Sequence, residues 1–182
     1  MKIKPILLSL AILAMLFVGC STKEAVKAPA PTKPDVVASA SVTKDPAVFT
    51  KLIGKTGNWI IAITDNMTIN KDLVLEGEFK NGKKDAAGKD IIQRKVALYA
   101  QDAKYVITAR YTLTAPKLTI KSPMASLQHG TFKGDLYVET NDFQLIDNKV
   151  IGNIYFISDA AKAGFKMDAT SSVSGVQEVK KQ

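Results

Sequence analysis

Cysteine, histidine and tryptophan are almost missing from this chain. Its 182 residues include one cysteine, Cys20, one histidine, His129, and one tryptophan. A disulfide within the chain is excluded, because it needs two cysteines. A zinc site needs clustered His, Cys and carboxylate ligands, and a Ser-His-Asp triad needs a histidine beside a nucleophile. His129 lies in SLQHGTF, without a nucleophile motif, so we expect an exposed histidine in a bend and no metal site.

Arginine is nearly as scarce, with Arg94 and Arg110 as its only occurrences. Paired carboxylates are the remaining candidates for acid–base chemistry. Asp135 and Glu139 lie four residues apart in a predicted strand, so their side chains share a face about 13 Å apart, farther than glycoside hydrolases use. The sequence therefore predicts no enzyme, no catalytic residue and no cofactor.

Long apolar runs are also absent. The longest uncharged, mainly apolar run, residues 5–19, has about 15 residues, whereas a membrane-spanning helix needs roughly 20. Lys2 and Lys4 precede it. A basic start followed by a short apolar run is the layout of a secretory signal peptide, which we place at residues 1–19.

The run ends in Phe17-Val18-Gly19-Cys20. This ending resembles the lipobox of bacterial lipoproteins. The resemblance implies that the signal is cleaved between Gly19 and Cys20, and that Cys20 carries the lipid. It also implies a lipid bilayer as partner and a location on the outer face of a bacterial membrane, either the cell membrane or the outer membrane.

Acidic residues are fewer than basic ones, and the formal net charge is +8. Removing residues 1–19 and their two lysines leaves 23 basic and 17 acidic residues, and half of this excess lies in residues 20–57. A basic segment beside a lipid is attracted to anionic headgroups by about 1 kcal/mol per lysine, with a merely solvated tail as the alternative. The basic residues form no concentrated patch with interleaved aromatics, so nucleic acid is not an expected partner.

Residues 21–47 are rich in Ala, Pro, Thr, Ser and Lys, with three prolines in residues 29–34. This composition predicts an extended, disordered tether. Residues 46–57 are predicted to form a short helix that ends at Gly54 or Gly57. The expected organisation is a signal peptide at 1–19, a lipidated tether at 20–57 and one β-rich domain at 58–182.

From residue 58 onward, short runs of Val, Ile, Thr, Tyr and Phe alternate with Asp, Asn, Gly and Lys. Many of these runs alternate apolar and polar residues, which is the period of a half-buried strand. Residues 81–90, NGKKDAAGKD, interrupt them and are expected to form an exposed loop or hairpin end. Residues 158–165 are expected to form one short helical turn at most. The domain is therefore predicted to be all-β.

Two segments have similar sequences, and each residue of the first, which starts at position 132, matches, at a fixed offset, a residue of the second, which starts at position 150. FKGDLYVE (132–139) and VIGNIYFI (150–157) share an apolar residue, Gly, Asp or Asn, an aliphatic residue and Tyr. A coil of this length is about one turn of a β-solenoid, which buries its inner face only by stacking on its neighbours. The cadence resembles right-handed parallel β-helix proteins, and among them the polymer-forming bactofilin-like domains.

The predicted fold is thus a single-domain parallel β-helix of about six or seven turns. The alternative is an antiparallel β-sandwich or barrel, whose hairpins would turn at Asp65-Asn66 and Asn81-Gly82. Edge lysines after the last strand-like segment, with a capping helix before the first, favour a monomer or limited oligomer over a filament.

Two hypotheses of function follow. The first is a non-enzymatic, lipid-anchored cell-envelope protein whose solenoid acts as a scaffold, a self-associating unit or an interaction module. The second is a carbohydrate-active β-helix that binds or cleaves an envelope or extracellular polysaccharide. An exposed aromatic stripe along one face of the domain would favour the second hypothesis.

Overall fold

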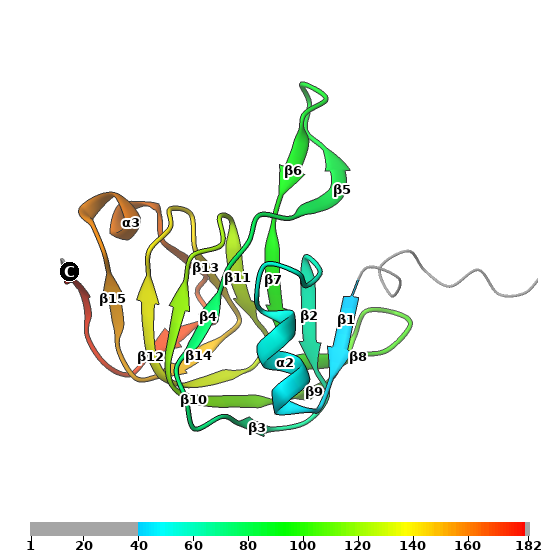
Figure 1. The fold of residues 1–182 in the computed structure, drawn as a ribbon, viewed down its shortest axis with the longest axis horizontal. Coiled ribbons are helices and arrows are strands. Elements are labelled where there is room, and N and C mark those ends of the chain that lie inside the picture. Colours follow the sequence, from blue (N-terminus) through cyan, green and yellow to red (C-terminus); the bar gives the residue numbers. More distant parts are fainter. Residues whose placement is uncertain (1–39, 181–182) are drawn as a thin grey trace, which may run out of the picture. The chain divides into compact units, whose positions relative to one another are not determined.

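The structure, a computed structural model, describes residues 40–180. These residues are mostly β-strands with short helices, in agreement with the all-β prediction (Figure 1). The predicted signal peptide, the Gly19–Cys20 cleavage site and most of the predicted tether lie outside the described residues.

One large sheet has six strands, and every strand pair in it is parallel. Its spatial order follows the chain, which means that each later strand is added beside the previous one. In that order the strands are β1 (Ala40–Thr43), β2 (Ile60–Ile63), β7 (Arg94–Ala97), β11 (Ala125–Gln128), β13 (Gln144–Ile146) and β16 (Lys166–Met167).

The second large sheet has eight strands and is also parallel in every pair. Two long strands form its centre, and pairs of short strands flank them. The long strands are β10 (Thr112–Ile120) and β12 (Thr131–Val138), and the short ones are β3 (Met67–Thr68), β4 (Leu73–Leu75), β14 (Lys149–Ile151), β15 (Ile154–Phe156), β17 (Ser172–Val173) and β18 (Gln177–Val179).

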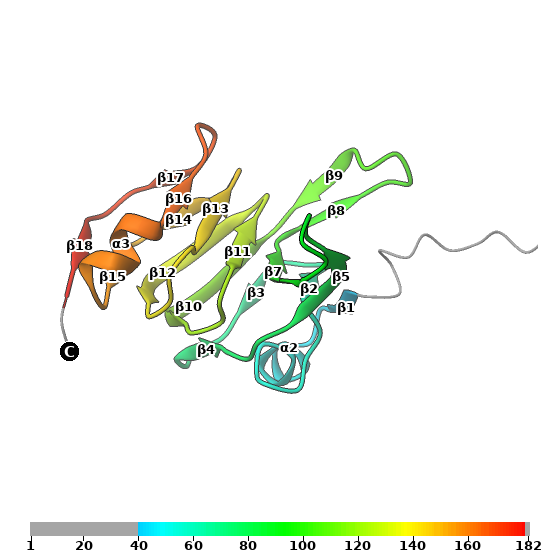
Figure 2. The ribbon, with the colours of Figure 1, turned by 90° about the horizontal axis from the view of Figure 1, so that it is seen from above.

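The two sheets share one hydrophobic core. From β7 onward, the chain adds strand residues alternately to the six-stranded sheet and to the eight-stranded sheet (Figure 2). We call one such circuit, with strand residues in both sheets, a pass of the chain. Alternate residues point inward, so Leu127 and Leu145 from one sheet meet Phe132 and Val150 from the other in a single buried cluster. Stacking therefore buries side chains that one pass alone would leave exposed.

The repeat read from the sequence corresponds to the strand register. Phe132 pairs with Val150 and Leu136 pairs with Ile154, both at the offset of the repeat. Between these pairs the strands turn a corner at Gly134 and Gly152. A Cβ on Gly152 would lie 2.0 Å from the carbonyl oxygen of Gly134, so only glycine allows the two passes to approach so closely.

Antiparallel pairing is confined, within residues 40–180, to two hairpins. One joins β5 (Lys80–Lys84) to β6 (Asp90–Ile92), and the other joins β8 (Tyr99–Gln101) to β9 (Ile107–Arg110). Residues 81–90 thus form a projecting hairpin, as expected (Figure 1).

The antiparallel alternative predicted hairpin turns at two positions, and both predictions are wrong. Asp65-Asn66 joins β2 to β3, which belong to different sheets, and Asn81-Gly82 lies inside β5. Within each large sheet, neighbouring strands come from successive passes of the chain. Every pass runs through that sheet in the same direction, so the neighbouring strands are parallel.

A strand and a helix of the described residues lie before the predicted boundary at residue 58. β1 pairs with β2, and α2 (Pro46–Leu52) follows it. The side chains of Phe49 and Ile53 are each 1% exposed and belong to the core. The boundary was missed because these two apolar residues lie in a segment of otherwise tether-like composition.

The predicted helix at residues 46–57 is confirmed, although it ends at Leu52, before either predicted glycine. Asp45 caps its first turn, since its carboxylate accepts hydrogen bonds from the backbone N–H groups of Ala47, at 2.7 Å, and Val48, at 3.1 Å. Near the other end of the domain, α3 (Asp159–Gly164) is capped in the same way by Ser158 and is the single short turn expected there.

Candidate functional site

His129 lies in the bend between β11 and β12, as expected, but its ring is partly buried and paired. Its Nδ1 lies 3.0 Å from Oδ2 of Asp147, which occupies the equivalent bend between β13 and β14. Both residues have a left-handed backbone, with φ of 59° and 48°. The prediction of a freely exposed histidine is therefore wrong, because the next pass of the chain brings a carboxylate against it.

Arg110, at the end of β9, binds the same carboxylate, with its Nη2 2.5 Å from Oδ2 of Asp147. Hydrogen bonds from His129 and then from Arg110 hold the pKa of Asp147 below its ordinary value. The following pass contributes Asp168, whose carboxylate accepts the backbone N–H of Asp147 at 2.9 Å. A hydrogen bond from the Ser171 hydroxyl is the main cause that lowers the pKa of Asp168.

Tyr99 and Lys95 complete this corner cluster, which we define as Lys95, Tyr99, Arg110, His129 and Asp147. The rings of Tyr99 and His129 meet edge to face at a centroid distance of 4.6 Å. Nζ of Lys95 donates to the hydroxyl of Tyr99 at 2.6 Å. The cluster thus connects the β8–β9 hairpin to two successive bends of the main stack.

A carboxylate that orients a histidine is one part of the machinery of general-base catalysis. Within residues 40–180, however, the only hydrogen-bond partner of the His129 ring is Asp147, and no hydroxyl or thiol nucleophile is bonded to it. The contact between His129 and Asp147 instead joins neighbouring passes of the chain.

Sequence reasoning missed this pairing although a signal for it existed. His129 and Asp147 are separated by the same offset as the FKGDLYVE and VIGNIYFI segments. Extending that alignment three residues toward the N-terminus places the two residues in adjacent bends. Arg110 has no such signal, because its strand belongs to a hairpin inserted between repeats.

The carboxylates Asp135 and Glu139 are each bound to other partners. Oδ1 of Asp135 accepts both the backbone N–H of Asn153, at 2.9 Å, and its side-chain amide, at 3.0 Å. Glu139 forms an ion pair with Lys121 at 3.5 Å. Asp135 and Asn153 are again separated by the offset of the repeat, so this contact also connects adjacent passes.

An aromatic pair lies on the outer face of the eight-stranded sheet. Tyr137 and Tyr155 are register partners whose ring centroids are 5.0 Å apart. Lys117 approaches the ring of Tyr137 at 5.5 Å, and Lys180 approaches that of Tyr155 at 4.8 Å. This tyrosine pair, flanked by lysines, is a short version of the aromatic stripe considered from the sequence.

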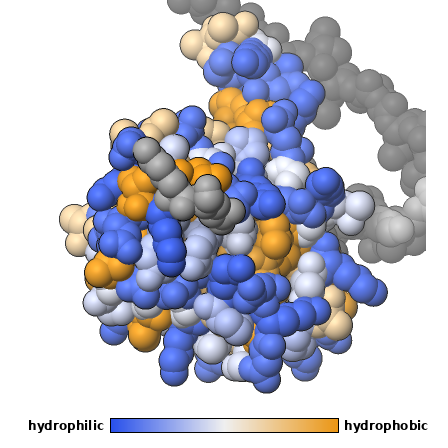
Figure 3. Space-filling view, turned by 60° about the vertical axis from the view of Figure 1, so that its left-hand side comes forward, coloured by the Kyte–Doolittle hydropathy of each residue, from blue (hydrophilic) through white to orange (hydrophobic). Residues whose placement is uncertain are grey.

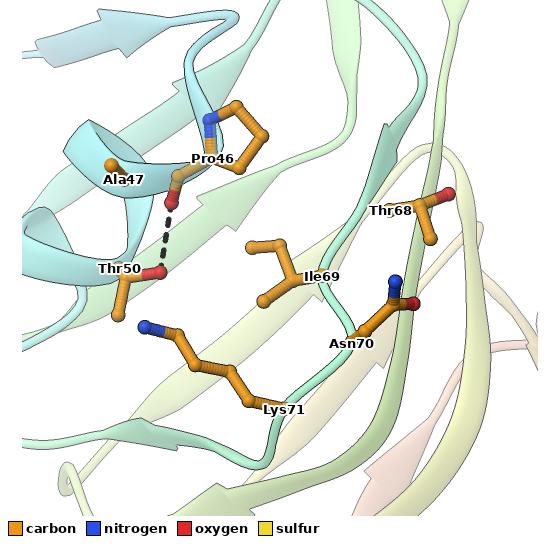
Figure 4. Close-up of a pocket in the computed structure, with 7 residues that line it drawn as sticks. All are labelled: Pro46, Ala47, Thr50, Thr68, Ile69, Asn70 and Lys71. Carbon is orange, nitrogen blue, oxygen red and sulfur yellow. Dashed lines mark hydrogen bonds between the residues drawn. The ribbon is translucent and has the colours of Figure 1, made fainter.

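Two hollows lie at the N-terminal end of the stack. The larger, about 380 Å³, is a shallow space between α2 and the chain that joins β3 to β4 (Figure 4). Lys71 is the one charged side chain in its lining, and the Thr50 hydroxyl donates to the carbonyl of Pro46 at 2.8 Å.

The smaller hollow, of about 170 Å³, is a groove between the outer face of the six-stranded sheet and strand β8. Small apolar side chains make up most of its lining. The lining residues are Ala40, Val42, Ile60, Ala62, Lys95, Ala97, Tyr99 and Gln101.

Elsewhere the surface is mixed. In Figure 3, where the side of α3 and β15 comes forward, small apolar patches are separated by polar side chains. Among the described residues, no group of His, Cys, Asp and Glu side chains is arranged to hold a metal ion. Within the same residues, no helix combines the length and apolar character needed to cross a bilayer.

Comparison with protein-family models, with curated proteins and with solved structures finds no match for this chain.

Proposed function

We propose that this protein is a non-enzymatic bacterial lipoprotein, anchored through Cys20 to the outer face of a membrane, whose β domain serves as a scaffold or interaction module. One observation carries the proposal for the domain. The polar residues considered for chemistry are bound from one pass of the chain to the next, His129 to Asp147 and Asp135 to Asn153. Such bonds stabilise a stack whose outer faces are then available to partners.

We infer further that the two parallel sheets are faces of one parallel β-helix. The support is the strand register, which follows the offset of the repeat, with stacked corner glycines, together with the addition of one strand per pass. From residue 58 onward, the six-stranded sheet has five strands and the eight-stranded sheet has five tiers, so this β-helix would have about five turns, fewer than the predicted six or seven.

The lipid anchor is supported by the order of features at the start of the chain: two lysines, a short apolar run, and Gly19-Cys20. The described domain begins at Ala40, twenty residues after Cys20. A short basic segment therefore separates the proposed anchor from the folded domain.

Metabolic labelling with a radioactive fatty acid in bacteria tests the anchor. We expect label in the wild-type protein and in the control Ser21→Ala, and none in Cys20→Ala. Cys20→Ala should also leave the membrane fraction. Equal labelling of wild type and Cys20→Ala would refute the lipoprotein assignment.

The oligomeric state tests the scaffold role. Phe49 and Ile53 bury α2 against the core beside β1 and β2. We expect α2, packed beside the first two strands of the six-stranded sheet, to hinder the stacking of a second copy at that end, so we expect a monomer or limited oligomer. Light scattering of residues 21–182 measures the mass, and long filaments in electron micrographs would contradict this expectation.

A second function, binding of an envelope polysaccharide, is favoured by the Tyr137–Tyr155 pair. Sugars pack against aromatic side chains, and the flanking lysines suit acidic sugars. Sedimentation with insoluble cell-wall polysaccharide should retain wild type and the neighbouring control Thr119→Ala, and lose Tyr137→Ser/Tyr155→Ser. Equal retention of all three proteins would remove this candidate.

A further inference from the structure

The β8–β9 hairpin ends in an exposed apolar tip, which we define as Lys104, Tyr105 and Val106. Tyr105 and Val106 are 61% and 58% exposed, the largest fractions among the exposed large hydrophobic residues of the described chain. Lys104 beside them is also exposed and supplies a positive charge. Adjacent exposed hydrophobic side chains on a projecting element are a common mark of a contact surface.

The tip has a defined conformation. Oδ1 of Asp102 accepts the backbone N–H groups of Lys104, at 2.8 Å, and Val106, at 3.0 Å. Tyr105 itself donates its N–H to the carbonyl of Asp102 at 3.1 Å. The turn is therefore held by its own hydrogen bonds and presents its side chains in a fixed direction.

Tyr105 has a φ of 64°, in the left-handed region. Asn, Asp or Gly usually occupies this conformation, because a bulky side chain is strained there. A tyrosine that is both strained and exposed gains nothing from packing within the domain. Strain of this kind points to a function outside the fold.

The tip lies near the N-terminal end of the described residues. Gln101, just before the tip turn, and Ala40, the first described residue, line the same groove. Figures 1 and 2 both show the β8–β9 loop extending beyond β1 on that side. Val42 of β1, 57% exposed, adds a further apolar side chain at the same groove.

We propose that the tip is a second membrane contact, which inserts Tyr105 and Val106 into the headgroup region of a bilayer that contains anionic lipid. Tyrosine favours the membrane interface because its ring is apolar and its hydroxyl is polar. Valine favours the acyl boundary, and Lys104 meets anionic headgroups. This inference rests on the proposed anchor at Cys20, which brings the domain to such a surface.

The distances permit this contact. Nineteen residues lie between Cys20 and Ala40, and even a fully extended chain of this length spans no more than about 70 Å. A tether of this length gives the tip a local lipid concentration far above that in free solution, so a contact too weak to hold the protein alone still becomes occupied. Two contacts would orient the domain, whereas a lipid alone would leave it free to turn.

The test replaces the native lipid by an artificial anchor. Residues 21–182 keep every described hydrogen bond and the whole core, and they contain no cysteine. This chain, with an N-terminal hexahistidine, is held on phosphatidylcholine–phosphatidylglycerol vesicles that contain nickel-chelating lipid. An environment-sensitive fluorophore is attached at Val106→Cys, or at the control Lys162→Cys on α3, which packs against β15 and β18.

We expect the label at residue 106 to shift to the blue on tethering, and to be quenched by brominated lipid, while the label at residue 162 does neither. Adding Tyr105→Asn should weaken the quenching at residue 106 by about threefold, because it removes the aromatic surface. Asn tolerates the left-handed conformation, so this variant keeps the fold.

An unchanged label at residue 106, or equal changes at both positions, would overturn the proposal. Because nickel replaces Cys20, this outcome does not depend on lipidation. Loss of fatty-acid labelling in Cys20→Ala, in turn, does not depend on the tip. The two proposals can therefore fail separately.

Discussion

Arg94 shows how one side chain can hold a loop against the core. It is completely buried, and its guanidinium donates to the carbonyls of Leu52 and Asn58, both at 2.7 Å, and of Gly54 at 3.0 Å. The ring of Phe79 lies 3.8 Å from its central carbon. Burial lowers the pKa of Arg94 to about 10, so it remains charged at neutral pH.

Replacing Arg94 by methionine should lower the free energy of unfolding by about 3 kcal/mol, because three backbone carbonyls lose a charged donor from the core. Arg110→Met is the matched control. It removes an arginine whose side chain is 48% exposed, and exposed ion pairs contribute about 1 kcal/mol or less. Urea unfolding at pH 7 measures both variants, and equal losses would contradict the assigned role of Arg94.

The lowered pKa of Asp147 predicts that the stability of the folded protein depends on pH. Its pKa is lowered in the folded protein, chiefly by His129 and Arg110. The folded state therefore binds this proton less readily than the unfolded state. The resulting stability is present above the ordinary carboxyl pKa and is lost as pH falls through the folded value.

Asp147→Asn should consequently be less stable than wild type near neutral pH. The difference should begin to shrink near pH 4, where the carboxyl of the unfolded chain takes up its proton, and should disappear as pH falls through the lower pKa of the folded protein. Denaturant unfolding from pH 2.5 to 7 would measure the gap. A gap that stays constant over this range would show that the carboxylate charge contributes nothing.

At the scale of elements, the corner glycines set the spacing between passes. Gly134 and Gly152 have φ of 140° and 153°. A Cβ on Gly134 would lie 1.8 Å from the carbonyl oxygen of Ala115. Each corner thus rests directly on the backbone of the preceding pass, which leaves no space for a side chain.

Gly152→Ala should cost about 3 kcal/mol or more, since backbone atoms must move apart. Gly82→Ala in the β5–β6 hairpin is the control, because it also has a positive φ, 79°, but no atom within 4 Å of the added Cβ. The control should lose only about 1 kcal/mol. Thermal unfolding followed by circular dichroism compares the two variants. Equal losses of stability would mean that the cost at Gly152 comes from its positive φ and not from the close approach of the Gly134 carbonyl.

At the scale of the whole molecule, the fold depends on residues that precede the β-rich sequence. β1 extends the six-stranded sheet, and α2 buries Phe49 and Ile53 in the core. Removing them would expose apolar surface and the edge of β2 together.

A chain that begins at residue 58 should therefore be much less stable than one that begins at residue 38. The burial of Phe49 and Ile53 alone accounts for about 1.5–3 kcal/mol each. Far-UV circular dichroism and urea unfolding of the two chains provide the comparison. If the chain that begins at residue 58 had an unchanged urea midpoint, β1 and α2 would contribute nothing to the stability of the domain.

The all-β class and the strand register at residues 132–157 were predictable. An uninterrupted repeat places Phe132 against Val150 without further information. The earlier half was not predictable in the same way. Ile60 pairs with Lys95 and Leu73 pairs with Leu118, at separations that two inserted hairpins set.

The candidate contacts divide in the same manner. The pairing of His129 with Asp147 follows from the repeat, whereas the approach of Arg110 depends on how the β8–β9 hairpin folds back. The outward display of Tyr105 likewise depends on the turn made by Asp102.

By itself the sequence determined the period of the stack, the positions that need glycine, and the order of features that predicts a lipid at Cys20. These depend on residue spacing and on local conformation, which a linear pattern records. The tertiary structure alone decided that β1 and α2 belong to the domain, which carboxylate contacts His129, and which apolar side chains remain exposed to solvent. These depend on contacts between residues far apart in the chain, and insertions of unequal length hide such contacts from any linear pattern.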